Sequence, residues 1–253
     1  MEEILKNGFA ELGISVPEDA VSKLRVYYES LEERNKVMNL TAISGEEDVA
    51  RLHFLDCAAL LTALDLGGKR VIDVGTGAGF PGMVLKILSP ETDFVLLDSL
   101  NKRIDFLSEL QEKLGLGKLS CVHARAEEAA KDWGGSFDIA MSRAVARLNV
   151  LCELCLPFVK VGGVFAAMKG PDCTGELQEA ENAIRTLGGR LRGTVPYTIP
   201  GTDIVHTVVI IEKVKPTHPK YPRKWAYSLY EIKLAIDAIN VPNPPRFTPT
   251  NNA

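Results

Sequence analysis

The amino-acid sequence predicts an α/β fold in which a mostly parallel, doubly wound sheet follows a cap of helices. Three features of the 253 residues lead to this prediction. The first part of the chain shows helical periodicity alone, and from Lys69 onward short apolar runs alternate with helical stretches. The last two apolar runs lie too close together for a helix to cross between them. Alternating short strands and helices are typical of a parallel sheet covered on both faces.

Residues 1–66 are predicted to form an N-terminal helical cap. Pro17 marks the start of a helix. Its apolar face carries residues at helical spacing, namely Val21, Leu24, Tyr27, Tyr28 and Leu31. Residues 46–64 show the pattern of one or two further helices. Gly67-Gly68 interrupts the helical pattern, so the boundary to the next domain is placed there.

Residues 67–214 are predicted to form the sheet domain. The expected strands are 70–74, 94–98, 119–123, 137–141 and 164–168, and the expected helices are 81–89, 101–114, 126–132, 148–159 and 174–187. Two further strands follow, Gly189–Ile199 and Val205–Val214, with a short turn around Pro200-Gly201 between them. Because a crossover helix does not fit there, these strands are predicted to form an antiparallel hairpin at the C-terminal edge.

Residues 215–253 are predicted to contain basic sequence, an amphipathic helix and a proline-rich tail. The window 213–224, KVKPTHPKYPRK, holds five Lys/Arg and no acid, although the net charge of the chain is −4. This segment is either a local patch for a polyanion or a solvated basic loop, and composition leaves both open. From Trp225 onward, apolar residues three and four apart predict the helix.

The bulk composition is that of a soluble globular protein, with 46% hydrophobic and 25% charged residues. No apolar run reaches the ~18 residues of a membrane span. The acidic N-terminus lacks the features of a signal peptide, so we expect a cytoplasmic protein without membrane contact. The five cysteines do not form a disulfide framework. Cys152 and Cys155 fall on a predicted helix without a second pair, so a buried structural role and no metal site are expected.

The stretch VIDVGTGAGFPG, Val71–Gly82, places four glycines after an apolar strand and raises the question of what approaches this backbone. A phosphate-binding P-loop is excluded, because Met83-Val84 stands where that motif needs Lys-Ser/Thr. A dinucleotide fingerprint is harder to exclude, since Gly77–Gly82 fits G-x-G-x-x-G. The acid Asp73 would repel a diphosphate, and Phe80-Pro81 replaces amide donors that a diphosphate needs. Both features favour S-adenosylmethionine, whose ammonium and sulfonium groups are positive.

Further cofactor contacts are predicted at the ends of the next two strands. Asp98 ends the second strand, where a carboxylate can accept the hydroxyls of an adenosine ribose. NAD enzymes use the same device, and Asp98 or Ser99 could instead cap the following helix. Ala126 and Glu127 follow the third strand, where a small residue and a backbone amide can border an adenine ring. Glu127 is equally compatible with a first-turn acid favoured by the helix dipole.

The chain resembles the ribosomal RNA small subunit methyltransferase G family, also called glucose-inhibited division protein B. The resemblance covers roughly residues 1–224 and rests on motifs in order: Asn39-Leu-Thr41, Arg51-Leu-His53-Phe-Leu-Asp56, Val71–Gly82, Leu97–Arg103, Ser142-Arg-Ala-Val145, Met168-Lys-Gly170 and Lys220-Tyr-Pro-Arg-Lys224. The sequence from Trp225 onward departs from the family pattern. The resemblance implies a Rossmann-like class I methyltransferase sheet in a bacterial cytoplasmic enzyme.

The resemblance also implies the reaction, methyl transfer from S-adenosylmethionine to N7 of a guanosine in the decoding region of 16S rRNA. The partner would be the rRNA or a small-subunit particle. By matching position, the implied cofactor contacts are Gly75, Phe80, Asp98, Ala126, Glu127 and Arg143. Asp73, Gly77 and Gly79 join them from the analysis of the glycine stretch.

The chemistry of N7 indicates which side chains to seek. N7 has an in-plane lone pair and no proton, so direct in-line transfer needs neither a general base nor a covalent intermediate. Arg143 and Lys169, at the ends of the fourth and fifth strands, are the candidates for holding guanine O6, with an ion-pair role as the alternative for each. His53 and Asp56 are expected at the junction of cap and sheet. Two other functions stay open: an NAD(P)-dependent oxidoreductase and a non-catalytic ribosome-binding factor.

Overall fold

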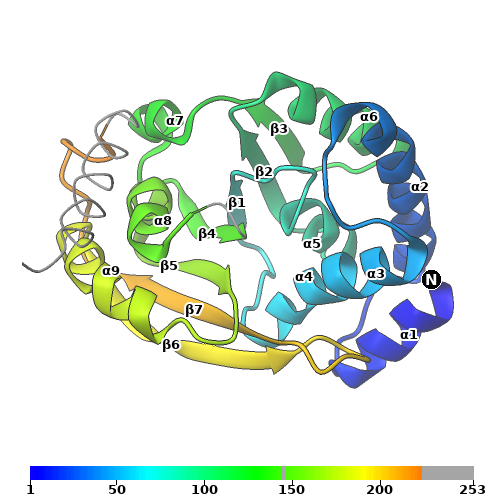
Figure 1. The fold of residues 1–253 in the computed structure, drawn as a ribbon. Helices are drawn as coiled ribbons and strands as arrows, with labels where there is room; N and C mark the ends of the chain where they lie inside the picture. The colour runs from blue at the N-terminus through cyan, green and yellow to red at the C-terminus, as the bar shows by residue number, and fades with distance from the viewer. Residues whose placement is uncertain (144–145, 224–253) are drawn as a thin grey trace, which may run out of the picture. The chain divides into compact units, whose positions relative to one another are not determined.

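The computed structural model describes residues 1–143 and 146–223. Residues Met1–Pro222 form one compact unit built on a seven-stranded sheet with the order β3-β2-β1-β4-β5-β7-β6 (Figure 1). The strands are β1 (Arg70–Val74), β2 (Asp93–Asp98), β3 (Leu119–His123), β4 (Phe137–Arg143), β5 (Val159–Lys169), β6 (Gly189–Thr198) and β7 (Val205–Lys213). The first five are parallel, which confirms the predicted α/β class with a mostly parallel sheet.

The predicted antiparallel hairpin is confirmed at the C-terminal edge. β7 pairs antiparallel with both β5 and β6. In the register with β5, Thr207 faces Lys169 and Glu212 faces Val164. β7 therefore begins beside the carboxyl end of β5 and ends beside the part of β5 where that strand enters the sheet.

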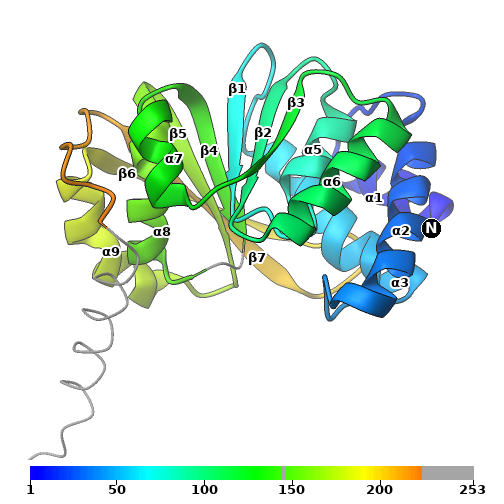
Figure 2. The ribbon, with the colours of Figure 1, turned by 90° about the horizontal axis from the view of Figure 1, so that it is seen from above.

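Helices connect the parallel strands and flank the sheet (Figure 2). They are α5 (Gly82–Leu88), α6 (Asn101–Leu114), α7 (Ala126–Trp133), α8 (Leu148–Cys155) and α9 (Thr174–Thr186). The expected helix over 148–159 was wrong at its end. α8 stops at Cys155, a 3₁₀ turn covers Leu156–Phe158, and β5 starts at Val159, five residues before the predicted strand. Pro157 lacks an amide hydrogen and cannot extend the α-helical hydrogen-bond pattern.

The cap consists of α1 (Glu2–Glu11), α2 (Ala20–Met38), α3 (Glu46–Val49), a π-helical segment Ala50–Leu55, α4 (Asp56–Ala58) and a 3₁₀ turn Ala59–Thr62. α2 starts three residues after Pro17 rather than at it. α2 packs on α5 and α6, as Figure 1 shows in blue beside the sheet. Cap residues such as Leu24 and Phe54 share one apolar core with sheet residues such as Val71 and Leu96, so cap and sheet are tied by burial.

Two further sequence predictions concern the C-terminal tail and membrane-spanning helices. The predicted helix after Trp225 and the proline-rich tail lie outside the described residues. Within the described residues, no helix is both long and apolar enough to cross a membrane.

Candidate cofactor and substrate site

The carboxyl ends of β1, β2, β4 and β5 meet at one edge of the sheet, where the glycine stretch follows β1. Gly75, Gly77 and Gly79 have φ values of 73°, 62° and 105°, a region that side chains with a Cβ rarely adopt. The loop bends through these residues before α5 begins at Gly82. The bend follows from the strand-loop-helix sequence and places the loop at the edge where open parallel sheets bind ligands.

The glycines serve two different purposes. A Cβ on Gly79 would lie 2.6 Å from Tyr27 Oη, and a Cβ on Gly82 would lie 2.8 Å from Asp73 Oδ2. These two positions are therefore fixed by packing within the protein. A Cβ on Gly77 would meet no described atom within 4 Å. The open space beside Gly77 is the part of the loop that a ligand can approach.

The backbone amides of the loop donate hydrogen bonds within the protein. Gly77 N donates to Asp98 Oδ2 at 2.9 Å, and Gly79 and Phe80 both donate to the Thr76 carbonyl, at 2.9 and 3.0 Å. Gly82 N donates to Asp73 Oδ2 at 2.8 Å. A diphosphate bound at a helix N-terminus needs free amides there. In this loop those donors are engaged by the protein's own carbonyl and carboxylate groups.

Asp73 is fully buried and only half satisfied. Its Oδ2 accepts hydrogen bonds from Thr76 Oγ1 at 2.7 Å and from Gly82 N at 2.8 Å, whereas its Oδ1 has no partner among the described residues. Burial raises the pKa of Asp73 to about 6, against the lowering effect of those hydrogen bonds. A buried oxygen without a donor marks a place for a positively charged or hydrogen-bonding group.

Asp98 joins the glycine loop to the start of α6. Its Oδ2 accepts from Gly77 N and, at 3.2 Å, from Arg103 Nη1, and its Oδ1 accepts from Leu100 N at 2.9 Å. A carboxylate offers about four acceptor positions, so one remains beside these three donors. The cap alternative was wrong for both Asp98 and Ser99, because Leu100 occupies the N-cap position of α6 without a side-chain cap.

Ala126 and Glu127, the predicted adenine contacts, lie in the first turn of α7. Ala126 is the first residue of α7, and Glu127 is buried in its first turn. Glu127 Oε1 accepts from Arg125 Nε at 2.8 Å. Both residues follow β3, the strand next to β2, so they lie on the same edge of the sheet as Asp98. Their contact with an adenine ring stays a prediction.

Phe80, in the glycine loop, packs against aromatic residues of the cap. Its ring stacks on His53 with 4.1 Å between ring centroids and on Tyr27 with 5.5 Å. The Arg143 guanidinium lies 5.0 Å above the same ring. Tyr27 Oη also donates to the Ala78 carbonyl at 2.5 Å, so the cap directly fixes the shape of the glycine loop.

Asp56 is the centre of a network at the junction of cap and sheet. Its Oδ2 accepts from Arg143 Nη1 at 2.9 Å, and its Oδ1 accepts from Tyr197 Oη at 2.7 Å and lies 2.8 Å from His206 Nδ1. Burial alone would raise the pKa of Asp56. Hydrogen bonds from His206 and Tyr197 and the charge of Arg143 hold it below its usual value. The network links α4, β4, β6 and β7.

His53 is neutral and structural in this arrangement, as its expected place at the junction requires. Its Nδ1 accepts from Arg143 Nη2 at 2.8 Å, so Nε2 carries the hydrogen and donates to Thr41 Oγ1, also at 2.8 Å. Burial and the neighbouring Arg143 charge lower the pKa of His53 to about 3. His53 therefore stays neutral near pH 7 and does not take up a second proton there.

Lys169 and Arg143, the predicted substrate-positioning residues, line one cavity of about 510 Å³. Lys169 Nζ pairs with Glu176 Oε2 at 2.7 Å and donates to the Ala146 carbonyl at 3.1 Å. The ion-pair alternative is therefore present for both cations. The other lining residues are Ile43, Leu52, His53, Asp56, Met168, Gly170, Glu176, Ile199, Ile204 and His206.

Tyr197 and His206 were not identified from the sequence. They lie opposite each other on β6 and β7, and they reach Asp56 across 141 and 150 residues of chain. The only sequence signal was a polar aromatic residue beside the turn of each hairpin strand. That signal does not reveal a partner in the cap.

The basic segment begins at the end of β7, away from the strand ends that carry the glycine loop. β7 runs antiparallel to β5, so Lys213 lies at the opposite edge of the sheet. Lys213 is buried and donates to the carbonyls of Leu156 at 2.7 Å and Leu187 at 3.0 Å. Burial lowers its pKa to about 8. Lys213 is therefore not accessible to a polyanion, whereas Lys215 and Lys220 are exposed.

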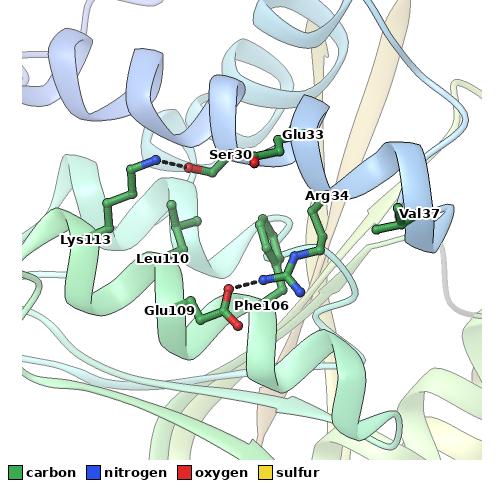
Figure 3. Close-up of a pocket in the computed structure, with 8 residues that line it drawn as sticks. All are labelled: Ser30, Glu33, Arg34, Val37, Phe106, Glu109, Leu110 and Lys113. Carbon is green, nitrogen blue, oxygen red and sulfur yellow. Dashed lines mark hydrogen bonds and ion pairs between the residues drawn. The ribbon is translucent and has the colours of Figure 1, made fainter.

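A second cavity, of about 410 Å³, lies between α2 and α6 (Figure 3). Arg34 pairs with Glu109 across this cavity, and Lys113 donates to Ser30 Oγ. The cysteines Cys152 and Cys155 are buried on α8, and burial raises the pKa of both thiols. Among residues 1–143 and 146–223, no group of three His, Cys, Asp or Glu side chains is placed to hold a metal ion.

The site fits S-adenosylmethionine better than a dinucleotide. The approachable side of the loop at Gly77 and the Oδ1 of Asp73, which no described residue engages, suit a cofactor with positive groups. The amides of Gly77, Gly79, Phe80 and Gly82 are already bonded within the protein. Asp98 supplies one further acceptor on the neighbouring strand. These are features of this chain's own residues, and they agree with the cofactor predicted from the sequence.

Comparison with solved structures supports the fold. A "predicted O-methyltransferase" of Agrobacterium tumefaciens superposes with a TM-score of 0.51 at 17% identity, over 66% of this chain and 83% of that chain. TrmN from Thermus thermophilus gives a TM-score of 0.50 at 21% identity, over 62% of this chain and 48% of that chain. Both likenesses are to the methyltransferase fold and carry no further detail of the site.

Comparison of sequences identifies the family. The family model described as rRNA small subunit methyltransferase G matches residues 20–198. The ribosomal RNA small subunit methyltransferase G of Clostridium perfringens strain 13 is 46% identical over 225 residues, which is 88% of this chain and 94% of that protein. The protein of the same name from Alkaliphilus metalliredigens is 48% identical over 224 residues, 87% of this chain and 94% of that protein. The chain therefore belongs to the rRNA small subunit methyltransferase G family, as the resemblance of its motifs implied.

Proposed function

We propose that this protein methylates N7 of a guanosine in the decoding region of 16S rRNA, using S-adenosylmethionine in a direct in-line transfer. The observation that carries the cofactor assignment is the buried Asp73 at the end of β1, whose Oδ1 lacks a partner in the described part of the chain. The relatives' names support ribosomal RNA as the substrate. The enzyme then works in the bacterial cytoplasm on the rRNA or on a small-subunit particle.

The residues that would hold the cofactor lie at the ends of three adjacent strands. Asp73 attracts the ammonium of the methionine part, and Gly75 and Gly77 let the cofactor approach the backbone. Asp98 accepts a ribose hydroxyl, and Ala126 with Glu127 borders the adenine. Gly79 and Phe80 pack against Tyr27 of the cap and so hold the loop in the shape that the cofactor needs. When bound, S-adenosylmethionine supplies a methyl group on a positively charged sulfur.

The protein's own task is to orient the guanine. N7 needs no base because it carries no proton. His53 would not serve as one, because burial lowers its pKa to about 3 and both of its ring nitrogens are engaged. The thiols of Cys57, Cys152 and Cys155 have raised pKa values through burial, which disfavours a covalent mechanism. Holding the reacting atoms in line contributes up to about 7–11 kcal/mol in favourable cases.

Arg143 and Lys169 are the positioning residues of this proposal. Lys169 has three N–H donors, of which Glu176 and Ala146 engage two, so one can hold guanine O6. Arg143 is fixed by Asp56 and His53 above the Phe80 ring. Arg143 lines the cavity proposed for the substrate and also contacts Phe80 of the glycine loop, so it joins the two parts of the site.

Two alternatives make different predictions. An NAD(P)-dependent oxidoreductase would need loop amides for the diphosphate, and Gly77, Gly79 and Gly82 use theirs internally. A non-catalytic ribosome-binding factor would have no use for a buried carboxylate with an unsatisfied oxygen. Methyl incorporation separates this factor from an enzyme.

The test is incubation of the full chain with methyl-labelled S-adenosylmethionine and small ribosomal subunits that lack the modification. Digestion of the rRNA to nucleosides should yield labelled 7-methylguanosine. Label in a different nucleoside would contradict the N7 assignment, and binding of subunits without incorporation would favour the non-catalytic factor. Asp98→Ala should fold normally but incorporate less methyl at limiting cofactor, since the carboxylate that accepts the ribose hydroxyl is removed.

A further inference from the structure

The 510 Å³ cavity beside Arg143 and Lys169 has a composition suited to a flat heteroaromatic ring. Its apolar lining comes from Ile43, Leu52, Met168, Ile199 and Ile204. Its polar lining comes from His53, Asp56, Arg143, Lys169, Glu176 and His206, most of which are already paired with one another or with the backbone. Pockets that bind small ring systems combine apolar walls with a few placed polar atoms that fix orientation.

Lys169 and His206 line this cavity from adjacent strands, β5 and β7. Thr207 pairs with Lys169 in the β5–β7 register, so His206 is one residue away at the carboxyl end of β5. Lys169 offers N–H donors. What His206 offers depends on which ring nitrogen carries the hydrogen.

Asp56 fixes that tautomer. Asp56 Oδ1 lies 2.8 Å from His206 Nδ1, and the carboxylate is an acceptor, so Nδ1 carries the hydrogen. In the neutral ring Nε2 then carries the lone pair. Within the described part of the chain, Nε2 of His206 has no hydrogen-bond partner, although the residue lines the cavity and its side chain is 31% exposed.

We propose that His206 is a specificity-determining residue for guanine, accepting a hydrogen bond at Nε2 from the Watson–Crick edge of the target base. This inference rests on the proposed function, in that the cavity receives the base to be methylated. Guanine presents the acceptor O6 next to the donors N1–H and the 2-amino group. Lys169 followed by His206 provides a donor followed by an acceptor, which matches that order.

The same pair discriminates against adenine. Adenine presents a 6-amino donor where guanine has O6, and an acceptor at N1 where guanine has N1–H. Lys169 would then face a donor and His206 Nε2 would face an acceptor. Buried polar groups left unpaired in this way are the strongest source of rejection between similar ligands.

The experiment measures binding of GMP and AMP to the full chain by titration with S-adenosylhomocysteine present. The wild-type protein should prefer GMP by at least about tenfold. His206→Ala should weaken GMP binding by about fivefold to tenfold and leave AMP binding unchanged, because one hydrogen bond is removed. His206→Gln should recover part of the preference, since its amide oxygen is also an acceptor.

Two controls make the result decisive. Thr194→Ala, at an exposed position of β6, should keep both affinities. 1-Methyl-GMP, which lacks the N1 hydrogen, should bind the wild-type protein more weakly than GMP, a test that needs no variant. A wild-type protein with equal affinity for GMP and AMP would overturn the proposal, as would His206→Ala with an unchanged preference. S-adenosylhomocysteine binding and methyl incorporation by the wild-type protein would leave the proposed function standing in either case.

Discussion

Two buried carboxylates, Asp73 and Asp56, lie in different regions of the site and have opposite environments. Asp73, in the strand before the glycine loop, has one oxygen that no described residue engages and a pKa raised to about 6 by burial. Asp56, at the junction of cap and sheet, has both oxygens engaged and a lowered pKa despite its burial. Asp73 therefore has an acceptor oxygen left over, whereas both oxygens of Asp56 are engaged within the protein.

This difference indicates that Asp73 serves ligand binding and that Asp56 serves stability. A carboxylate that is poorly satisfied in the free protein gains most when a positive ligand arrives. A carboxylate that neutralises a buried arginine stabilises the fold and keeps Arg143 and His206 in place. Substitutions at the two positions should therefore affect different measurements.

The largest expected effect is loss of stability in Asp56→Ala. Removal of one partner leaves the Arg143 guanidinium, whose side chain is 15% exposed, without its counter-charge. We expect a decrease of about 3–5 kcal/mol in the free energy of unfolding, measured by urea denaturation. The control Glu109→Ala breaks an exposed ion pair with Arg34 and should cost less than about 1 kcal/mol. Equal effects in the two variants would place Asp56 among ordinary surface acids.

The next effect is loss of cofactor affinity in Asp73→Asn, without loss of stability. The amide can still accept the hydrogen bonds of Thr76 and Gly82, so the free energy of unfolding at pH 7 should change by less than about 1 kcal/mol. Loss of the charge should weaken S-adenosylmethionine binding by about 10–100-fold. Asp93→Asn, at an exposed acid on the other edge of the sheet, should bind normally. A destabilised Asp73→Asn protein with normal affinity would remove the contrast with Asp56.

The pH dependence of binding should sharpen the comparison further. In the free protein Asp73 becomes protonated as the pH falls through about 6, and the neutral carboxyl no longer attracts a positive ligand. Affinity for S-adenosylmethionine should be constant above pH 7 and fall by up to about tenfold per pH unit below pH 6. The Asp73→Asn variant should lack this decrease. Wild-type affinity that stays flat down to pH 5 would contradict the assignment.

The smallest effect is expected at the basic segment. Charge reversal at Lys220, Arg223 and Lys224 should reduce rRNA affinity only modestly, because β7, after which this segment follows, ends on the opposite side of the sheet from the glycine loop. The slope of affinity against salt should decrease by about one for each phosphate that the variant no longer neutralises. A salt slope identical to that of the wild-type protein would leave the segment as solvated surface.

The sequence predicted what depends on local pattern and on the rules of parallel sheets. Asp73 and Asp98 could be placed together because parallel strands end at the same edge. The extent of β5 and the end of α8 could not be predicted, because Pro157 and the paired Gly162-Gly163 obscure the transition. The Asp56 network joins segments about half the chain apart through the register of an antiparallel edge, and no local pattern encodes that register. The burial of Lys213 could not be predicted either, because two of its acceptors are the backbone carbonyls of Leu156 and Leu187, which no side-chain pattern reveals.

The central claim is that the loop after β1 binds a positively charged sulfur cofactor and not a diphosphate. Calorimetric titration of the full chain with S-adenosylmethionine, S-adenosylhomocysteine and NADH tests it most directly. We predict saturable binding of S-adenosylmethionine and S-adenosylhomocysteine, weakened in Asp73→Asn most for the positively charged S-adenosylmethionine, and no binding of NADH. Saturable binding of NADH with none of either sulfur compound would contradict the account.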